Sequence, residues 1–523
     1  MKILDCTLRD GGYYTNWDFN SKIVDAYILA MNELPIDYLE VGYRNKPSKE
    51  YMGKFGYTPV SVLKHLRNIS TKKIAIMLNE KNTTPEDLNH LLLPIIGLVD
   101  MIRIAIDPQN IDRAIVLAKA IKTMGFEVGF NVMYMSKWAE MNGFLSKLKA
   151  IDKIADLFCM VDSFGGITPK EVKNLLKEVR KYTHVPVGFH GHDNLQLGLI
   201  NSITAIDDGI DFIDATITGM GRGAGNLKME LLLTYLNKHH GLNVDFNVLG
   251  NIITTFTPLL EKYQWGTNLP YMLSGANNIP QKEVMDWVTN RVYSFNSIIR
   301  ALDNRKNKME DNAKYPLLNI KNKFDRVVII GGGFNAIEHK EAIKSFIETH
   351  TNTAIIFATA RYAREYLDVN APHFYCLVGN EGHRLTHNIN PQNLSGICVL
   401  PPYPRPMGTE VPEYAKNVTF ELENITFIDQ YKDSVTTIAL QLAILLTDQD
   451  IYLVGYDGYP GNVLSEKEMA LTNENRTIFA TYTTISGKIL KSLTPSIYKE
   501  IEVVSVYPVS YTHLRAHETR SNL

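Results

Sequence analysis

The chain has 523 residues, 45% of them hydrophobic and 21% charged, with a formal net charge of −2. This length predicts two or three domains that each bury a core, and the near-neutral charge gives no bulk attraction to nucleic acid or to an anionic membrane. The four cysteines form no CxxC pair, and we find neither a signal sequence nor an apolar run that could span a bilayer, so we expect a cytoplasmic protein.

Eight short apolar segments alternate with helix-like segments in the first part of the chain. The expected strands are residues 2–7, 37–42, 73–78, 101–106, 127–133, 155–161, 185–189 and 211–217. Helix-like stretches such as 21–33 and 169–182 lie between them. This alternation is typical of a (β/α)8 barrel, with an open doubly wound sheet as the alternative. We predict an α/β fold with a TIM barrel over residues 1–240.

Residues 241–322 are expected to form a helical cap and linker, in which the charged stretch 300–314 is the linker itself. A second α/β unit is predicted over residues 324–508. It begins with a strand that runs into a glycine-rich turn at 325–335, followed by a helix at 337–348. The further strands expected in this unit are residues 353–358, 374–378, 396–400 and 450–454.

The last segment, residues 509–523, is set apart from the fold. Its residues 509–519 resemble the conceptual translation of a transposase adapter used in DNA sequencing libraries. We therefore expect an artefact here and assign no role to the two histidines of this tail.

Polar residues gather where the expected barrel strands end, which is where TIM barrels carry their chemistry. These positions are Arg9, Asp10, Glu40, Arg44, Asn131, Asp162, His190, His192 and Asn226. Glu40, Arg44, Asn131 and Asp162 are the expected substrate-binding residues, although Asn131 and Asp162 fit a supporting loop role equally well.

His190 and His192 stand two residues apart on an extended segment, so both imidazoles can face one point. Asp10 and Asn226 would close on the same point, because the first and last strands are neighbours in a closed barrel. Two imidazoles with oxygen donors suit Mg, Mn or Zn. The alternative is a packed or surface histidine pair without a metal.

Arg9 precedes Asp10 and could hold the oxyanion of an enolate together with a metal ion. Such an enolate forms when the bond beside a 2-oxo acid breaks. A structural ion pair between Arg9 and Glu40 is the alternative, and the two roles are compatible.

Three separated motifs resemble the signatures of the DRE-TIM metallolyase superfamily, which is HMGL-like. They are Asp5-Cys-Thr-Leu-Arg-Asp-Gly-Gly12, His190-Gly-His-Asp-Asn194 and Gly221-Arg-Gly-Ala-Gly-Asn226. Within residues 1–300 the likeness is greatest to 4-hydroxy-2-oxovalerate aldolases and to aldolase-like proteins of surface-polysaccharide gene sets. The resemblance implies a homodimer, with metal ligation by Asp10, His190 and His192, Asn226 as a ligand or support, and an enolate-stabilising Arg9.

The chain departs from this aldolase pattern after Asp10, where the resemblance implies an acid/base histidine and Tyr13 and Tyr14 stand instead. A tyrosine with its ordinary pKa near 10 is a poor base at neutral pH. The acid/base group is therefore left open among Tyr14, Tyr271 and a metal-bound water. The cysteine-bearing loop of the CoA lyases is also missing, which argues against that activity.

In the second unit, Gly331, Gly332 and Gly333 follow a strand and could hold a phosphate on backbone N–H groups, although a simple turn explains them equally well. Together with Asp457 after a later strand, they faintly resemble the Rossmann-like fold of bacterial sialyltransferase-like and glycosylation-associated proteins. That resemblance implies a nucleotide or nucleotide-sugar site near residues 331–335, with Asn335, and near Asn380 and Asp457.

The function predicted from these residues is a divalent-metal-dependent aldolase or lyase, with Mn or Mg as the preferred ion and Zn as a further option. It would make or break a carbon–carbon bond between a 2-oxo acid such as pyruvate and an aldehyde, in sugar or surface-polysaccharide metabolism. The alternatives are a Claisen-type synthase that joins an acyl-CoA to a 2-oxo acid, and a non-catalytic binding module in glycan assembly.

Overall fold

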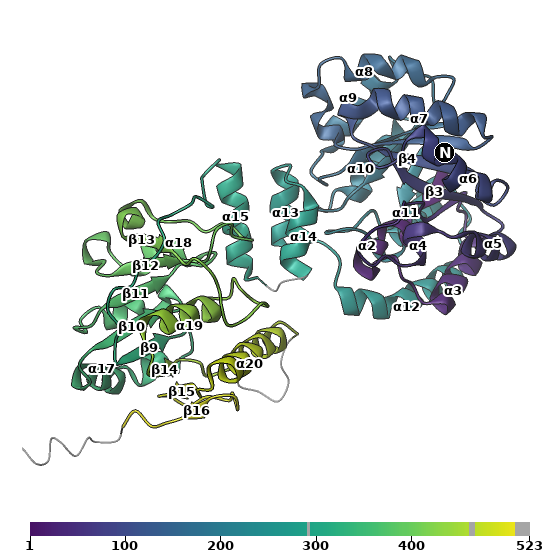
Figure 1. Ribbon diagram of the computed structural model, residues 1–523. Coiled ribbons are helices and arrows are strands. Elements are labelled where there is room, and N and C mark those ends of the chain that lie inside the picture. Colours follow the sequence, from purple (N-terminus) through teal and green to yellow (C-terminus); the bar gives the residue numbers. More distant parts are fainter. Residues whose placement is uncertain (290–292, 460–465, 508–523) are drawn as a thin grey trace, which may run out of the picture. The chain divides into compact units, whose positions relative to one another are not determined.

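The computed structural model describes residues 1–289, 293–459 and 466–507 (Figure 1). The chain divides into two compact units, Met1–Asn290 and Arg291–Leu523. The segment 241–322 that was expected as a connector is therefore shared between them. The tail expected as an artefact lies outside the described residues. No helix among the described residues is long and apolar enough to cross a membrane.

The first unit contains the predicted TIM barrel. Its eight parallel strands are β1 Lys2–Asp5, β2 Tyr38–Tyr43, β3 Lys73–Asn79, β4 Met101–Ile106, β5 Glu127–Val132, β6 Leu157–Asp162, β7 Val187–Gly191 and β8 Phe212–Ala215. Each strand pairs with the next, and β1 pairs with β8, with Leu4 opposite Asp214, so that the barrel closes. The fold prediction is confirmed, and the open sheet is excluded.

Helices surround this barrel (Figure 1). The longer ones are α3 Ser21–Glu33, α5 Val60–Ile69, α7 Ile111–Thr123, α9 Pro169–Val179, α10 Gly198–Asp207, α11 Met229–His240, α12 Phe246–Tyr263, α13 Leu269–Ala276 and α14 Gln281–Thr289. The shorter ones are α1 Thr7–Asp10, α2 Gly12–Thr15, α4 Lys54–Tyr57, α6 Leu88–Leu92 and α8 Phe144–Lys147. Local sequence sets their starts: α9 begins at a proline behind a capping box in which Thr168 and Glu171 each bond the other's backbone N–H.

The strand residues point alternately outward to the helices and inward to the barrel axis. Ile102 and Ile104 belong to the large apolar core shared with the helices, whereas Met101 belongs to a smaller cluster with Leu4 and Leu157. This inner cluster fills one part of the barrel axis with apolar side chains. Polar residues fill the rest of the axis and form the site described below.

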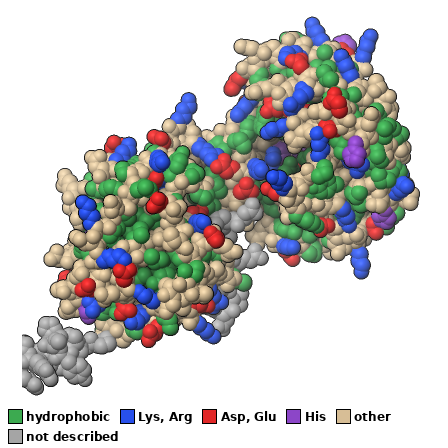
Figure 2. All heavy atoms as spheres, viewed as in Figure 1, with side chains coloured by type: hydrophobic (Ala, Val, Ile, Leu, Met, Phe, Trp, Pro, Cys, Tyr) green, Lys and Arg blue, Asp and Glu red, His purple; other side chains and the backbone are tan. Residues whose placement is uncertain are grey.

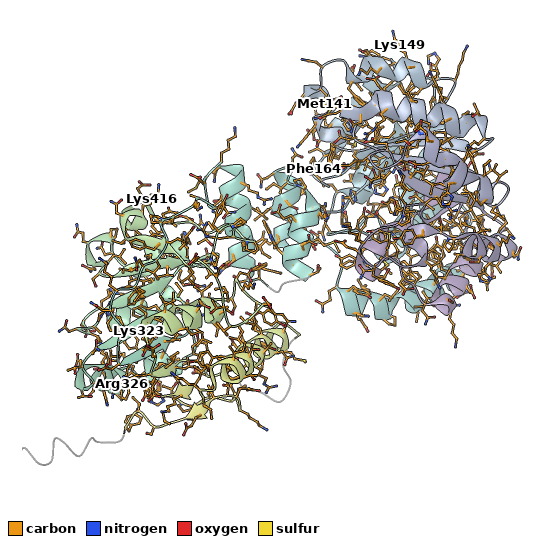
Figure 3. The ribbon with its side chains drawn as sticks, in the orientation of Figure 1. Met141, Lys149, Phe164, Lys323, Arg326 and Lys416 are labelled. Carbon is orange, nitrogen blue, oxygen red and sulfur yellow. The ribbon has the colours of Figure 1, made fainter. Side chains whose placement is uncertain are left out.

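The second unit is built on one parallel sheet in the order β13-β12-β11-β10-β9-β14-β15-β16. The strands are β9 Arg326–Ile330, β10 Thr353–Phe357, β11 His373–Cys376, β12 Ile397–Leu400, β13 Thr419–Glu421, β14 Asp450–Val454, β15 Lys491–Ser492 and β16 Glu502–Val503. The helices are α15 Phe295–Lys306, α16 Asn335–Glu338, α17 Lys340–Thr349, α18 Glu381–Asn388, α19 Val435–Leu446 and α20 Glu466–Ser486. Figure 3 labels Arg326, where β9 begins, and Lys416, which precedes β13.

Both faces of this sheet are covered, because alternate residues of its strands enter two different cores. Val327 and Ile329 pack into one core and Val328 and Ile330 into the other. The strand order reverses beside β9, between β10 and β14. A parallel sheet covered on both faces, with such a reversal, is a doubly wound arrangement.

Some expected elements of this unit differ in the structure. The helix expected at 337–348 is two helices, α16 and α17, which meet at His339. The stretch 300–314 expected as a linker is helical as far as Lys306. Three strands were missed, β13, β15 and β16, and each has only two or three residues. Such short segments carry no alternation of polar and apolar residues that a sequence pattern could reveal.

The surface matches the composition. Figure 2 shows basic and acidic side chains interspersed with apolar ones over the visible face of each unit. A mixed surface of this kind is ordinary for a globular protein and offers no broad field of one sign.

Candidate metal centre

Three side chains from three separate segments meet at the carboxyl end of the barrel. Asp10 ends the short helix α1 after β1, His190 lies in β7, and His192 directly follows β7. One ligand atom of each lies within 4.8 Å of the others, and all three residues are buried. The spacing of two residues thus places both imidazoles on one side, as the sequence pattern requires.

His190 is held between two carboxylates. Its Nδ1 lies 3.0 Å from Oδ2 of Asp214, and its Nε2 lies 3.5 Å from Oδ2 of Asp10. Burial alone would lower the pKa of His190, but Asp10 and Asp214 outweigh it and raise that pKa. With Nδ1 fixed on Asp214, Nε2 is the nitrogen that faces Asp10 and could bind a metal ion.

His192 is oriented by the backbone. Its Nδ1 donates to the carbonyl oxygen of Asp162 at 2.7 Å. Burial, followed by the charge of His190, lowers the pKa of His192 to about 3. The ring is therefore neutral at physiological pH, and its other nitrogen carries a free lone pair, which is the form in which histidine binds metals.

Asn226 completes the group from the glycine-rich loop after β8. Its Nδ2 donates to Oδ2 of Asp10 at 2.5 Å, and its Oδ1 is buried without a hydrogen-bond partner among the described residues. One carboxylate, two imidazoles and an amide oxygen are donors that Mg, Mn and Zn accept. The residues present therefore fit a divalent metal ion, and the unpartnered Oδ1 of Asn226 is one further donor of the kind that such an ion accepts.

Arg9 reaches across the mouth of the barrel beside this group. Its Nε donates to Glu40 at 2.7 Å and its Nη1 to Asp10 at 2.5 Å. Burial would raise the pKa of Asp10, but the guanidinium beside it lowers that pKa far below its usual range. The Nη2 of Arg9 is buried without a partner among the described residues, so one donor remains for a ligand. Both expected roles of Arg9 are thus compatible with its geometry.

Two residues that the sequence reasoning overlooked support the centre from below. Arg103, fully buried in the barrel, donates to Asp214 at 2.7 Å and lies 3.4 Å from Glu40. The carboxylate that orients His190 is therefore itself neutralised. Arg103 lies inside β4, and Asp214 lies inside the segment 211–217 that was expected as the eighth strand, so the rule that looked at expected strand ends missed both.

The four expected substrate-binding residues separate into two groups. Glu40 binds Arg9, and Asn131 accepts from Arg103 at 2.5 Å, so both belong to the network under the metal group. Asp162 instead accepts backbone N–H groups of its own loop, and burial raises its pKa to about 6. The guanidinium of Arg44 donates to three backbone carbonyls, and the structure brings neither Asp162 nor Arg44 to the metal group through its carboxyl or guanidinium.

Tyrosines flank the centre. Tyr14 donates to the carbonyl of Gly223 at 2.9 Å, and burial raises its pKa to about 12. Burial also raises the pKa of Tyr271, and Tyr14 contributes to that rise. Both side chains are therefore protonated at neutral pH, which is the form in which a phenol donates a proton and cannot itself accept one.

A second pair of tyrosines, Tyr13 and Tyr43, was not singled out as a site. Their hydroxyl groups are 3.2 Å apart, and the guanidinium of Arg222 lies 4.9 Å above the ring of Tyr13. Tyr43 lies close enough to Arg9 and Asp10 for both charges to act on its pKa, which burial raises. No motif marks this pair, because its members come from different strand ends.

In the second unit, the glycine turn is closed by its own contacts. Asp457 accepts the backbone N–H of Asn335 at 2.9 Å, and the N–H groups of Gly331 and Gly333 donate to backbone carbonyls of β14 and the residue after it. Gly332 keeps its N–H free of these contacts. The structure thus brings together the expected residues Gly331, Gly333, Asn335 and Asp457. The backbone N–H groups of Gly331, Gly333 and Asn335, which would hold a phosphate, already donate hydrogen bonds within the protein. Nucleotide binding here stays a prediction.

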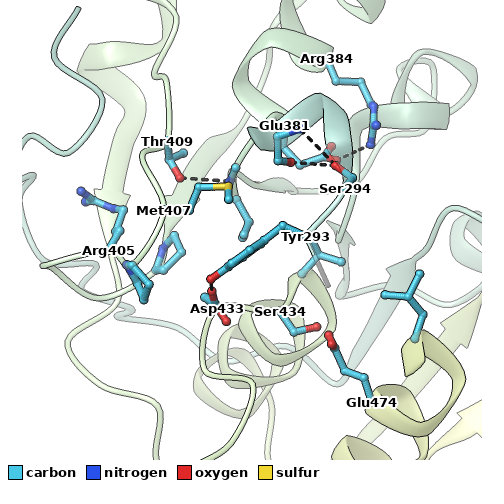
Figure 4. Close-up of a pocket in the computed structure, with 17 residues that line it drawn as sticks. Tyr293, Ser294, Glu381, Arg384, Arg405, Met407, Thr409, Asp433, Ser434 and Glu474 are labelled. Atoms are coloured by element: carbon cyan, nitrogen blue, oxygen red, sulfur yellow. Dashed lines mark hydrogen bonds and ion pairs between the residues drawn. The ribbon is translucent and has the colours of Figure 1, made fainter. Parts of the chain in front are cut away.

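A pocket of about 230 Å³ lies elsewhere in this unit, beyond the ends of β11 and β12. Figure 4 shows the ring of Tyr293 lying across it, with its hydroxyl on Asp433, and Arg384 paired with Glu381. Asn380, the residue before α18, donates its N–H to Ser297 at 3.2 Å on this side. Its neighbours Gly379 and Glu381 line this pocket, and the expected role of Asn380 in a nucleotide site stays a prediction.

Comparisons with known proteins place these observations in context. The family model described as HMGL-like matches residues 101–254. A crystal structure described as the N-terminal domain of a putative aldolase from Bacteroides vulgatus is 98% identical; the match covers 58% of this chain and 100% of that one, with a TM-score of 0.55.

Curated relatives match the same half of the chain at lower identity. A protein named 4-hydroxy-2-oxovalerate aldolase from Pelotomaculum thermopropionicum is 27% identical over 283 residues, which are 53% of this chain and 82% of the relative. One of the same name from Moorella thermoacetica is 28% identical over 293 residues, with the same two coverages.

Proposed function

We propose that this chain, which belongs through its first unit to the HMGL-like family, is a divalent-metal-dependent aldolase. The family model matches residues 101–254, and the relatives named above carry the aldolase name. The reaction would form or cleave the carbon–carbon bond beside a 2-oxo acid such as pyruvate. The observation that carries the proposal is the convergence of Asp10, His190 and His192 beside a guanidinium with one unpartnered nitrogen.

Asp10, His190 and His192 would hold the ion, with Asn226 as a further ligand or as support. A bound Mg or Mn ion, or Zn as the third option, would polarise the oxo group of the substrate and make the neighbouring carbon more acidic. The Nη2 of Arg9 would donate to the oxygen on which negative charge develops as the enolate forms. Because Glu40 and Asp10 hold the other nitrogens of Arg9, that donor is fixed before the substrate arrives.

Tyr14 and Tyr271 are proposed as acids. In the direction of addition, the enolate carbon attacks the aldehyde carbonyl carbon, and the carbonyl oxygen needs a proton. A phenol that is protonated at neutral pH can supply it to the more basic alkoxide, and both tyrosines keep their protons because burial raises their pKa. The proton acceptor in the enolisation step is open between water and the ionised phenol that such a donation leaves behind.

The experiment that tests this proposal is hydrogen–deuterium exchange at the methyl group of pyruvate, followed by NMR with Mn, Mg or Zn added. Metal-dependent exchange in the wild type, lost in His190→Ala and kept in the exposed control His184→Ala, is the expected result. A protein that binds the metal and exchanges no proton would overturn the pyruvate aldolase. Turnover of a thioester would then favour the Claisen synthase, and the absence of any turnover would favour a binding role.

The remaining expectations are proposals about context. The union of an aldolase-like barrel with a second parallel-sheet unit supports a role in sugar or surface-polysaccharide metabolism, with a nucleotide or nucleotide sugar as ligand of the second unit. Calorimetric titration of the full chain with nucleoside diphosphates and nucleotide sugars tests the ligand, and sedimentation tests the expected homodimer. If none of these titrations shows heat of binding, the second unit does not bind a nucleotide or nucleotide sugar.

A further inference from the structure

A cavity of about 490 Å³ opens beside the metal centre, at the carboxyl ends of β2 and β3 and next to α2. Tyr13, Trp17 and Tyr43 form one part of its lining, and Asn79, Asn82 and Thr83 are among the residues of the rest. Its volume falls in the range of sites for small molecules, which is about 300–1,000 Å³. Nothing so far in the mechanism uses this space.

The cavity adjoins the residues of the metal centre. The indole Nε1 of Trp17 donates to the backbone carbonyl of Arg9 at 2.9 Å, and Tyr43, whose hydroxyl contacts that of Tyr13, lies close enough to Arg9 for the guanidinium to act on its pKa. A molecule that reacts with an enolate held at Arg9 can therefore reach it from this side. The hydroxyl groups of Tyr13 and Tyr43, both of which line the cavity, can donate to the carbonyl oxygen of that molecule.

Among the described residues that line the cavity, all but Lys46 are uncharged, and the tyrosine, asparagine, serine and threonine side chains can both donate and accept hydrogen bonds. The Oδ1 of Asn79 accepts the N–H of Lys81 at 3.0 Å, which leaves its Nδ2 without a partner among the described residues. The amide of Asn82 has no side-chain partner in the described parts of the chain either. Amides of this kind bind hydroxyl groups well, because each hydroxyl is both donor and acceptor.

Within the described parts of the chain, the lining residues themselves offer no unpaired cation to an anionic guest; the guanidinium of Arg222 lies over the ring of Tyr13 but is not among them. Lys46 is the one charged residue in the described lining, and its ammonium is paired with Asp87 at 2.6 Å. No arginine is among the lining residues that the structure describes, and phosphate sites in proteins commonly rely on arginine forks or on unpaired lysines. The aromatic rings supply apolar faces for carbon atoms, while the amides supply polar contacts.

We propose that this cavity binds the aldehyde partner, and that this aldehyde is a neutral polyhydroxylated one of the sugar class rather than a short alkyl or a phosphorylated aldehyde. The inference rests on the proposed aldolase function and deepens it. In the reaction, pyruvate loses one methyl proton, the resulting carbon bonds to the aldehyde carbon, the carbonyl π bond breaks, and its oxygen takes up a proton. The product is a polyhydroxylated 4-hydroxy-2-oxo acid.

The test measures aldol addition by the full-length protein with pyruvate, Mn and matched aldehydes: erythrose, butanal and erythrose 4-phosphate. A site built on hydrogen bonds discriminates strongly against an analogue that lacks the bonding groups, so kcat/KM for erythrose should exceed that for butanal by about 100-fold or more. It should also exceed that for the phosphate ester. In Asn79→Leu, kcat/KM for erythrose divided by kcat/KM for butanal should fall about tenfold or more. The exposed control Asn251→Leu should keep the wild-type value of this ratio.

The outcomes separate this inference from the function on which it rests. If pyruvate exchanges its methyl protons but butanal or the phosphate ester is the better partner, the polyhydroxylated aldehyde is wrong and the aldolase stands. An unchanged ratio in Asn79→Leu would show that the cavity is not the aldehyde site. Absence of methyl exchange in the wild type would instead remove the aldolase itself.

Discussion

Asp214 lies 3.0 Å from Nδ1 of His190, and this contact decides which nitrogen of the imidazole faces Asp10. The carboxylate is neutralised in turn by the guanidinium of Arg103. The two buried groups Arg103 and Asp214 therefore orient one of the proposed metal ligands, His190. Supporting contacts of this kind commonly change metal affinity when they are removed.

Replacing Asp214 by asparagine should weaken Mn binding about 10–100-fold, because the amide holds the imidazole less firmly and leaves Arg103 without its partner. Isothermal titration measures the affinity. The control is Asp207→Asn, an exposed residue at the end of α10. Equal affinity in the two variants would show that His190 needs no support from Asp214.

Arg9→Lys should slow methyl proton exchange of pyruvate about 100-fold, since lysine keeps the charge but cannot hold Glu40, Asp10 and an oxyanion on separate nitrogens. We expect Mn affinity to change less than about tenfold. Arg113→Lys, which changes a half-exposed arginine on α7, is the matched control. An exchange rate like that of the control would exclude Arg9 from enolate stabilisation.

Tyr14→Phe and Tyr271→Phe should each slow aldol addition about 100-fold, because general acid catalysis commonly contributes that much. Metal affinity should stay the same in both, as neither hydroxyl is among the contacts of Asp10, His190 or His192. Tyr182→Phe, at a half-buried position after α9, controls for the loss of a hydroxyl. Full activity in both site variants would move the acid to the pair of Tyr13 and Tyr43.

Asp5 should make the first unit less stable as the pH rises from about 4 to 6. Burial raises its pKa to about 6, although Tyr27 and Thr7 donate to it. Below pH 4 the carboxyl is protonated in both states. Above pH 6 it is ionised in both, and the folded state then carries a buried charge that costs about 3 kcal/mol.

The Asp5→Asn variant should lose this pH dependence. Its free energy of unfolding, relative to that of the wild type, should therefore increase as the pH rises from about 4 to 6. Denaturant unfolding followed by tryptophan fluorescence reports on the first unit, because all four tryptophans lie in it. Asp112→Asn, at an exposed position of α7, should track the wild type at every pH. Parallel curves for Asp5→Asn and the wild type would contradict the raised pKa.

Gly333→Ala should destabilise the second unit, because a Cβ there would lie 2.6 Å from Cγ of Asp457 and 2.6 Å from a backbone oxygen. Gly332→Ala is a close control, since its Cβ would meet its nearest atom at 3.4 Å, an ordinary contact. Calorimetry should show a lower unfolding temperature for Gly333→Ala alone, by about 4 °C or more. Equal unfolding temperatures in the two variants would mean that the glycine turn shifts to make room for the added methyl group.

Much of the barrel could be predicted because local pattern and global fold agree. β4 matches its predicted bounds, and the ends of the other strands shift by a few residues at most. Each barrel strand is an apolar run closed by helix signals, such as the capping box before α9. The shortest strands of the second unit lack such a pattern. β13 and β15 each pair with a longer strand, β12 and β14, and β16 pairs in turn with β15.

The sequence by itself determined the metal group, because Asp10, His190, His192 and Asn226 all stand at or near strand ends, and a closed barrel brings strand ends together whatever the other details. Only the tertiary structure decided what surrounds that group. Arg103 reaches Asp214 across 111 positions of the chain, and Asn79 at the end of β3 lines the same cavity as Tyr13 of α2. Contacts between residues so far apart depend on the packing of whole strands and loops, which no local pattern records.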